Sequence, residues 1–493
     1  ARRRAAEAEL ARKSAELQER MRSVNELVRR GRESISGGQY DVARRFLASA
    51  QENLPTGEDR FAARTLSDIA EVFYEGYSRA PESADGIQSA KDAQKAAQEA
   101  IRRDPTNARP HFTLSKIYND SKLPDLAVKS LEEATRLDPR NYLYAFELGK
   151  TQFALRRFEE ARRSFESAGS LNPAFEPAFY NLGVTHRVLR NNEAALTAFR
   201  TAVRIKPDFV RAHIDIGRVL FARGDTRGAI TAYRTALSFE PRNVHALRDL
   251  GLAQVREGNL PEAERSFEQA LSVESDAVTN FNLANVKIDM GKHSEAVPYA
   301  ERAVRAAPNN AQFLYALGYA QDGAGNTDGA VAAYQRAAAL DRNFAPPRIN
   351  LGKLFLEAGF IDRALPLLEE AYRIDPESLE ANNNLANAYG RKGLMDKSIF
   401  HYEKALQLSP RNPTIRLNLA RAYVSAGSLE KARDAYVELL KLAPSEWDAY
   451  LELGKVYVGL KDPANARRVL NELRTRKPDF EKRAEVDSIL AGL

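Results

Sequence analysis

The sequence predicts an all-α solenoid, a stack of similar helix pairs, from three observations. Proline recurs at a fixed interval along most of the chain. Between the prolines, small and large apolar residues occupy the same places in each interval. The chain has 493 residues, which is too long for one ordinary globular core. A period between about 20 and 50 residues is typical of a repeat array, in which each unit packs mainly against its neighbours.

The interval between prolines is 34 residues in two long runs. The runs are Pro105, Pro139, Pro173, Pro207, Pro241 and then Pro376, Pro410, Pro444, Pro478. Between them, Pro308 keeps the period, Ser275 and Arg342 replace the proline, and one residue is missing between Ser275 and Pro308. Proline cannot continue a hydrogen-bonded helical turn, so we expect the second helix of each pair to end just before each of these prolines.

Four positions within each interval predict two helices that pack closely. With Ala108 as position 1, position 7 is Leu or Ile, position 8 is small, and position 20 is Ala in ten of eleven units, with Ser398 as the exception. Position 24 is bulky in most units, as in Phe165 and Tyr334. Positions 4, 7, 8 and 11 share one helix face, and positions 20, 24 and 27 share another. We expect small residues at 8 and 20 to face each other, with the residue at 24 filling the remaining space.

Glycine at position 15 predicts the turn between the two helices in seven units: Gly224, Gly258, Gly291, Gly325, Gly359, Gly393 and Gly427. The 34-residue helix–turn–helix unit resembles the tetratricopeptide repeat (TPR) family. Eleven such units span residues 106–478, about three quarters of the chain. The resemblance implies a right-handed superhelix, in which the first helix of each pair lines a concave surface.

Both ends of the chain depart from this pattern. Residues 1–23 are rich in Ala, Arg and Glu and predict a charged N-terminal helix, which is free, part of a coiled coil, or an extension of the solenoid. Residues 24–105 hold two degenerate copies of the repeat, and residues 81–86 interrupt the second copy. Residues 479–493 predict a C-terminal capping helix, because the outer face of a terminal repeat meets water.

Composition excludes several classes of function. Lys and Arg number 73 against 67 Asp and Glu, and the two signs are interleaved, so no nucleic-acid partner is expected. The absence of cysteine removes disulfides and thiolate chemistry, and no apolar run of about 18 residues predicts a membrane span. The chain begins at Ala1, which leaves a removed signal peptide and missing upstream sequence both open. A bacterial periplasm or envelope and the cytoplasm therefore remain as alternative compartments.

Candidate binding residues occupy position 6, which commonly faces the concave surface in the TPR family. Asparagine stands there in five of eleven units: Asn181, Asn282, Asn350, Asn384 and Asn418. An amide donates to a peptide carbonyl and accepts from a peptide N–H, so a ladder of amides suits an extended backbone. The pattern resembles the asparagine ladder in the superhelix of O-GlcNAc transferase. The alternative is that these amides bond only to solvent or to neighbouring helices.

Positions 5 and 9, beside the asparagines, supply further candidates. Tyr180, Phe281 and Tyr315 at position 5 either anchor partner side chains or pack between adjacent first helices. Lys353 and Arg421 stand at position 9. The carboxylate clamp of some TPR domains needs basic residues at two places where this chain has acidic ones, Asp448 and Glu452. Binding of an acidic chaperone tail is therefore not expected.

No catalytic, metal or cofactor site is predicted. The six histidines are dispersed, and His111 and His213 fall at position 4, where we expect a packing role. Gly323, Gly325 and Gly329 follow no predicted strand, so they are not expected to bind phosphate.

The sequence thus predicts a non-catalytic scaffold or adaptor that binds an extended peptide or partner segment in a concave groove. Two alternatives remain open. One is an architectural spacer in a larger assembly, such as a bacterial envelope complex, which contacts its neighbours through the convex face and residues 1–22. The other is the adaptor region of a longer chain with an upstream enzyme or membrane segment.

Overall fold

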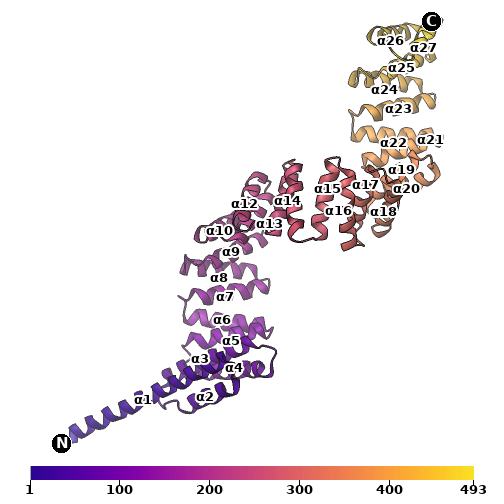
Figure 1. Cartoon of the computed structure of the whole chain (residues 1–493). Helices are drawn as coiled ribbons and strands as arrows, with labels where there is room; N and C mark the ends of the chain where they lie inside the picture. The colour runs from indigo at the N-terminus through magenta and orange to yellow at the C-terminus, as the bar shows by residue number, and fades with distance from the viewer. Residues whose placement is uncertain (1) are drawn as a thin grey trace. The chain divides into compact units, whose positions relative to one another are not determined.

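The protein is described by a computed structural model that covers residues 2–493, so Ala1 of the expected N-terminal segment lies outside the described residues. Within residues 2–493 there are 27 α-helices and no strand, which confirms the predicted all-α class. Contacts divide the chain into two compact units, Ala1–Ala253 and Gln254–Leu493. In each unit the helices follow one another as stacked pairs (Figure 1).

The helices of the first unit are α1 (Arg2–Ser36), α2 (Tyr40–Glu52), α3 (Asp59–Arg79), α4 (Ala84–Arg103), α5 (Ala108–Asp120), α6 (Pro124–Leu137), α7 (Tyr142–Ala154), α8 (Phe158–Leu171), α9 (Glu176–Val188), α10 (Asn192–Ile205), α11 (Val210–Ala222), α12 (Thr226–Phe239) and α13 (Val244–Arg256), within which the division falls.

The helices of the second unit are α14 (Leu260–Val273), α15 (Ala277–Asp289), α16 (His293–Ala306), α17 (Ala311–Gly323), α18 (Thr327–Leu340), α19 (Ala345–Glu357), α20 (Ile361–Ile374), α21 (Leu379–Arg391), α22 (Met395–Leu408), α23 (Pro413–Ser425), α24 (Leu429–Leu442), α25 (Trp447–Gly459), α26 (Pro463–Arg476) and α27 (Arg483–Gly492). In all eleven repeats, the first helix covers positions 1 to 13 and the second covers positions 17 to 30.

Close packing within each pair depends on the residues at positions 8 and 24. A Cβ added to Gly217 would lie 2.4 Å from the Tyr233 ring, and one added to Gly318 would lie 2.7 Å from the Tyr334 ring. At both glycines the nearest neighbour of position 8 is thus the large residue at position 24. Any side chain at these glycines would displace a buried ring, since protein interiors have little free volume.

The turn between the paired helices uses the left-handed backbone conformation at position 15 in every repeat. The seven glycines predicted there have φ between 74° and 86°. The other four repeats carry lysine or arginine with φ of 58° to 60°: Lys122, Arg156, Arg190 and Lys461. Because that conformation strains a residue with a Cβ, these four turns are held by the helix packing around them.

Position 4 caps the loop that precedes its helix. In four repeats its side chain lies within hydrogen-bonding distance of the proline carbonyl at position 32 of the preceding repeat: His213 to Pro207 at 2.8 Å, Asn382 to Pro376 at 2.9 Å, Arg416 to Pro410 at 2.8 Å and Tyr450 to Pro444 at 3.4 Å. His213 therefore makes a polar contact in addition to its packing, in which the ring stacks 5.9 Å from Phe239.

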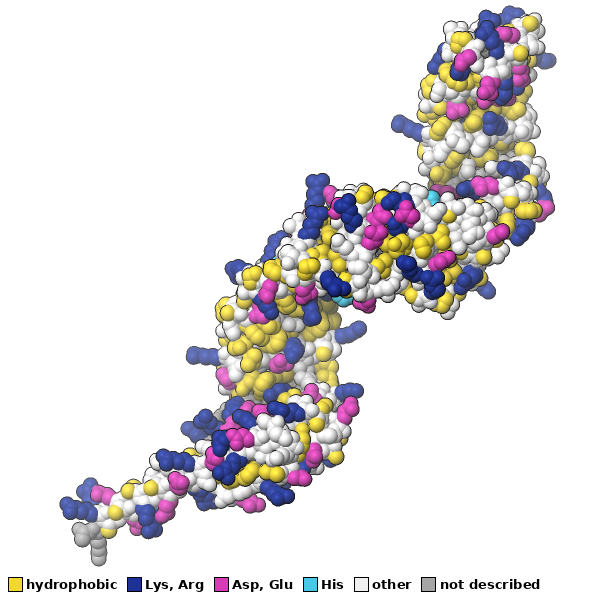
Figure 2. Space-filling view, viewed as in Figure 1, with side chains coloured by type: hydrophobic (Ala, Val, Ile, Leu, Met, Phe, Trp, Pro, Cys, Tyr) yellow, Lys and Arg dark blue, Asp and Glu magenta, His cyan; other side chains and the backbone are white. Residues whose placement is uncertain are grey.

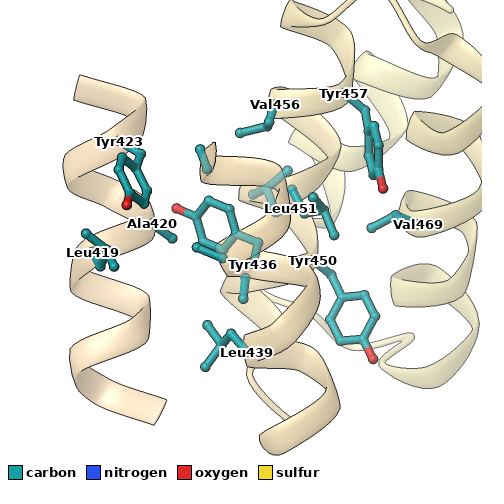
Figure 3. Close-up of a cluster of buried hydrophobic side chains, with 14 of the residues drawn as sticks. Leu419, Ala420, Tyr423, Tyr436, Leu439, Tyr450, Leu451, Val456, Tyr457 and Val469 are labelled. Atoms are coloured by element: carbon teal, nitrogen blue, oxygen red, sulfur yellow. The ribbon is translucent and has the colours of Figure 1, made fainter. Parts of the chain in front are cut away.

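The core consists of apolar clusters that link each helix pair to the next. Near the C-terminus, Tyr436 of α24 is fully buried and points between α23 and α25, where Leu419, Ala420 and Leu451 surround it (Figure 3). Burying one large side chain of this kind contributes roughly 1.5–3 kcal/mol. The stability of the array is therefore distributed over many similar local contacts.

The helices at the two ends differ from those of the eleven repeats. Helix α1 runs unbroken for 35 residues, so the expected boundary between residues 23 and 24 lies inside it. Leu10 in its first half is 71% exposed, whereas Val24 is fully buried. The interruption at residues 81–86 covers the end of the turn between α3 and α4 and the first three residues of α4; the two helices have 21 and 20 residues. At the other end, α27 packs on α26 and buries Val486.

Acidic and basic side chains are interspersed over the face of the molecule seen in Figure 2. Among residues 2–493, no helix combines the length and the apolar composition needed to cross a membrane. Over the same described range, no group of three or more His, Cys, Asp or Glu side chains is placed to hold a metal ion.

Candidate functional site

A large groove lies on the first helices of three successive repeats in the second unit. It has a volume of about 850 Å³ and is lined by residues of α17, α19 and α21, by residues of the loop before α21, and by His293 of α16. Four residues predicted from the sequence line it: Tyr315, Asn350, Lys353 and Asn384. They come together because position 5 of one repeat and positions 6 and 9 of the next face the same side of the stacked first helices.

Asn350 links Tyr315 in the wall of this groove to Tyr334, a fully buried residue of α18. Its Nδ2 donates to the hydroxyl of Tyr315 at 3.3 Å and to the hydroxyl of Tyr334 at 3.2 Å. Burial raises the pKa of both tyrosines, so the two hydroxyls stay protonated at neutral pH. The amide hydrogens of Asn350 are therefore already used, and its Oδ1 is the atom left to accept a bond from a ligand.

Asn384 is placed one repeat further along, and its partner lies on its own helix. Its Oδ1 accepts a hydrogen bond from the Nδ2 of Asn383 at 3.3 Å, and both side chains are half-buried in the groove wall. Within residues 2–493, the Nδ2 of Asn384 has no hydrogen-bond acceptor. Asn350 and Asn384 thus offer an acceptor and a donor on neighbouring helices.

Asn418 and Arg421 lie in a second, smaller pocket. This pocket has a volume of about 270 Å³ and is formed by α21, α22 and α23. Arg391 and Tyr402 line it as well, and burial raises the pKa of Tyr402 to about 12. These two predicted residues belong to the same series of first helices as the groove but not to the groove itself.

The remaining predicted residues are not in the groove. Asn181 donates from Nδ2 to the carbonyl of Pro177 in its own helix at 2.8 Å. Tyr180 donates from its hydroxyl to Asp215 at 2.8 Å. Phe281 packs against Phe313, with ring centroids 4.9 Å apart. Asn282, its neighbour on α15, is half-buried two repeats before Asn350.

Several lining residues were not singled out from the sequence. They include His293, Tyr319, Asp322 and Glu380. The last three occupy positions 9, 12 and 2 of first helices, which share the helical face of positions 5 and 6. A systematic reading of that whole face would have found them, whereas His293 comes from a second helix and depends on how the pair is folded.

Carboxylates in the groove are only partly balanced by cations. The ammonium of Lys404 lies 3.0 Å from Glu377, and the ammonium of Lys353 lies 3.6 Å from Glu357. Three other carboxylates line the groove: Asp322, Asp375 and Glu380. Among the described residues these three have no ion-pair partner. The groove therefore has a net negative charge.

Stacked helix pairs with an open groove on their first helices define an α-helical repeat protein. The sequence profile of the tetratricopeptide repeat matches residues 118–174, 146–208, 214–277, 281–343, 349–413 and 417–479, more than half of the chain. The chain belongs to the tetratricopeptide repeat family. Proteins of this family bind protein or peptide partners and are generally non-catalytic scaffolds.

Solved structures that resemble the chain include other TPR proteins. YrrB, a TPR protein with an unusual peptide-binding site, is 22% identical with a TM-score of 0.35, over 38% of this chain and 96% of its own. A chain of the APC/C hetero-tetramer Cut9–Hcn1 is 17% identical with a TM-score of 0.41, and the match covers 87% of this chain and 98% of that one. MamA from Desulfovibrio magneticus RS-1 is 24% identical with a TM-score of 0.32, and the match covers 34% of this chain and 96% of that one. A comparison with curated proteins found no match.

Proposed function

We propose that this chain is a non-catalytic TPR scaffold that binds an extended segment of a partner protein along α17, α19 and α21. The observation that supports this most directly is the groove of about 850 Å³ on three consecutive first helices. A groove of that size accommodates several residues of a peptide. Its walls combine aromatic rings with amides, which is the combination that binds a backbone and its side chains together.

The spacing of the polar groups suits an extended backbone. Neighbouring packed helices are roughly 10 Å apart, and an extended chain advances about 3.3 Å per residue. A segment of about six residues would therefore pass from α17 to α21. Asn350 would accept a backbone N–H through Oδ1, and Asn384 would donate to a backbone carbonyl through Nδ2, in the manner of the asparagine ladder expected from the sequence.

Asn418 and Arg421 extend this proposal by one repeat. The smaller pocket around them shares α21 with the groove. A longer segment would continue from α21 onto α23 and meet Asn418 there. We expect the Asn418→Ala substitution to weaken binding less than changes in the groove, because that pocket is smaller.

The experiment that tests the proposal uses the full chain and a phage-displayed library of random 12-residue peptides. Peptides that are enriched on the chain are synthesised with a fluorescent label, and their affinity is measured by fluorescence anisotropy. The doubly substituted Asn350→Ala, Asn384→Ala chain should bind about tenfold more weakly, since each lost hydrogen bond contributes about 0.5–1.5 kcal/mol.

The matched control is the Asn343→Ala, Asn471→Ala chain, which removes two exposed amides outside the groove. It should bind like the wild type. Helix content is checked for both variants by circular dichroism. Unchanged affinity of the groove variant, with unchanged helix content, would show that the proposal is wrong.

A further inference from the structure

We infer that the segment bound in this groove is basic, and that a lysine or arginine side chain of the partner lies against Tyr319 between Asp322 and Glu380. The inference rests on the proposed function and adds to it the charge of the ligand. Three kinds of observation support it: uncompensated carboxylates, an exposed aromatic ring, and a comparable site inside the first unit.

The charges of the groove favour a cationic ligand. Asp322, Asp375 and Glu380 have no ion-pair partner among the described residues. Lys353, the lysine in the described lining, is already beside Glu357. Carboxylates that line a concave surface focus a negative potential, which attracts a basic side chain and raises its local concentration.

The aromatic residues of the groove provide a surface for the same side chain. Tyr319 is 41% exposed, although its ring centroid lies 6.2 Å from that of Tyr315 and 6.1 Å from that of His293. Tyr319 is thus held in place by two rings while one part of it stays open. An ammonium or guanidinium group over such a ring gains roughly 0.5–1 kcal/mol at an exposed site.

The first unit already contains a lysine held in this way by the chain itself. The Nζ of Lys116 lies 4.7 Å from the centroid of the Tyr74 ring and 4.9 Å from that of Phe112. Burial lowers the pKa of Lys116, and four carboxylates that include Glu71 and Glu147 act in the opposite direction. Lys116 therefore rests over two rings in an acidic surrounding.

The repeat positions make this comparison specific. Lys116 stands at position 9 of the first repeat, and Tyr319 stands at position 9 of the seventh. In the seventh repeat Tyr319 therefore takes the place that Lys116 has in the first, and Lys353, at position 9 of the eighth repeat, lies beside Glu357. A basic residue of the partner would supply the cation that Lys116 supplies in the first unit.

The test begins with the enriched 12-residue peptides, whose Lys and Arg content is compared with that of the unselected library. We expect enrichment of Lys and Arg. We also expect the affinity of an enriched peptide to fall by about threefold to tenfold on the Asp322→Asn, Glu380→Gln chain, which corresponds to one or two exposed ionic contacts. Replacing the basic residues of the peptide by glutamine should produce a similar loss.

The matched control is the Asp208→Asn, Glu481→Gln chain, which undergoes the same change of net charge at two exposed sites outside the groove. Its affinity should equal that of the wild type. Peptides that need Asn350 and Asn384 but are neutral or acidic would overturn this inference and leave the proposed function intact. Equal binding to the Asp322→Asn, Glu380→Gln chain would do the same. If no enriched peptide needs Asn350 and Asn384, both proposals are wrong.

Discussion

Two surfaces of the molecule use the same repeat positions in opposite ways. On α9 and α11 of the first unit, the position-5 residue Tyr180 donates at 2.8 Å to the position-6 residue Asp215 of the next repeat. Asp215 is 5% exposed at its side chain and has Arg187 and Arg218 at 3.5 Å. The acidic charge of this surface is therefore neutralised by the chain itself.

On α17 and α19 of the second unit, the same two positions are taken by Tyr315 and Asn350, which bond at 3.3 Å. The charge at position 6 is replaced by a neutral amide, and the nearby carboxylates of Asp322 and Glu380 have no cation among the described residues. The same arrangement of helices thus carries carboxylates that the chain itself neutralises in the first unit and carboxylates without a cation among the described residues in the second. The choice depends on which residues stand at positions 2, 6, 9 and 12.

The largest expected effect follows from removing the acid of the closed surface. Asp215→Ala leaves two arginines and a tyrosine hydroxyl without their shared partner, and we expect it to lower the free energy of unfolding by about 2–4 kcal/mol. Asn350→Ala should lower it by about 1 kcal/mol. Urea titration followed by circular dichroism measures both.

The order of the two variants should be reversed when peptide affinity is measured instead of stability. Asp215→Ala should leave the affinity of a groove-selected peptide unchanged, while Asn350→Ala should reduce it. Peptide affinity that falls in Asp215→Ala as much as in Asn350→Ala, or a larger loss of stability in Asn350→Ala than in Asp215→Ala, would contradict the comparison.

A second test adds a methyl group at equivalent glycines of the two surfaces. Gly217→Ala would press on Tyr233 and Gly318→Ala on Tyr334, and each should cost about 1–3 kcal/mol through overpacking. Because the Tyr334 hydroxyl holds Asn350, Gly318→Ala should also weaken peptide binding. Gly217→Ala is its matched control, and an equal loss of binding in both variants would count against a local effect.

Acidification should weaken the helix that carries Asn384. The Nδ1 of His401 on α22 lies 3.0 Å from Oδ1 of Asn382 on α21, and burial, with smaller effects of Lys404 and Lys397, lowers the pKa of His401 to about 4. The unfolded chain takes up this proton near its ordinary pKa of 6.5, before the folded chain does. Stability is therefore present at neutral pH and is lost as the pH falls from about 6.5 towards 4.

The contribution of His401 to this loss should be about 2 kcal/mol between about pH 7.5 and pH 5. His401→Gln, which replaces the imidazole by an amide that can form hydrogen bonds but does not titrate, should remove that part of the pH dependence. Urea titrations of both chains at the two pH values provide the measurement. The same pH dependence in His401→Gln and in the wild type would exclude His401 as its source.

The smallest expected effects concern the turns. Arg190 has φ of 60° where Gly393 of a later repeat has φ of 81°. Arg190→Gly should stabilise the chain by about 1 kcal/mol, and Gly393→Arg should destabilise it by about 1–2 kcal/mol. A Cβ at Gly393 would meet nothing within 4 Å, so backbone strain alone produces the second effect. Thermal unfolding measures both changes, and shifts of the same sign would contradict this explanation.

The repeated parts of the fold were predictable from the sequence because each position recurs in many copies. Leucine at 7, a small residue at 8, alanine at 20 and the turn at 15 locate both helices of every repeat. The four non-glycine turns were less evident, because packing imposes a conformation that lysine and arginine do not prefer. The single long helix α1 also hides the expected boundary at residue 23, since no helix-ending residue stands there.

The candidate site was predictable only in part. The sequence places Tyr315, Asn350, Lys353 and Asn384 on one surface, and they do line one groove. It does not show that Asn181 donates a hydrogen bond to its own helix or that the Tyr180 hydroxyl donates one to Asp215. Such partners depend on the side-chain conformations and on the registry between neighbouring repeats, which a single repeat position does not specify.

The most direct measurement is photocrosslinking at position 9 of one first helix in each unit, α17 and α13. Benzoylphenylalanine replaces Tyr319 in one chain and Leu252, an exposed residue of the first unit, in another. Each chain is irradiated with the same enriched, labelled peptide. The account predicts a crosslink from position 319 that excess unlabelled peptide abolishes, and none from position 252. Equal crosslinking at both positions, or none at 319, would contradict the claim that the groove on α17, α19 and α21 is the binding surface.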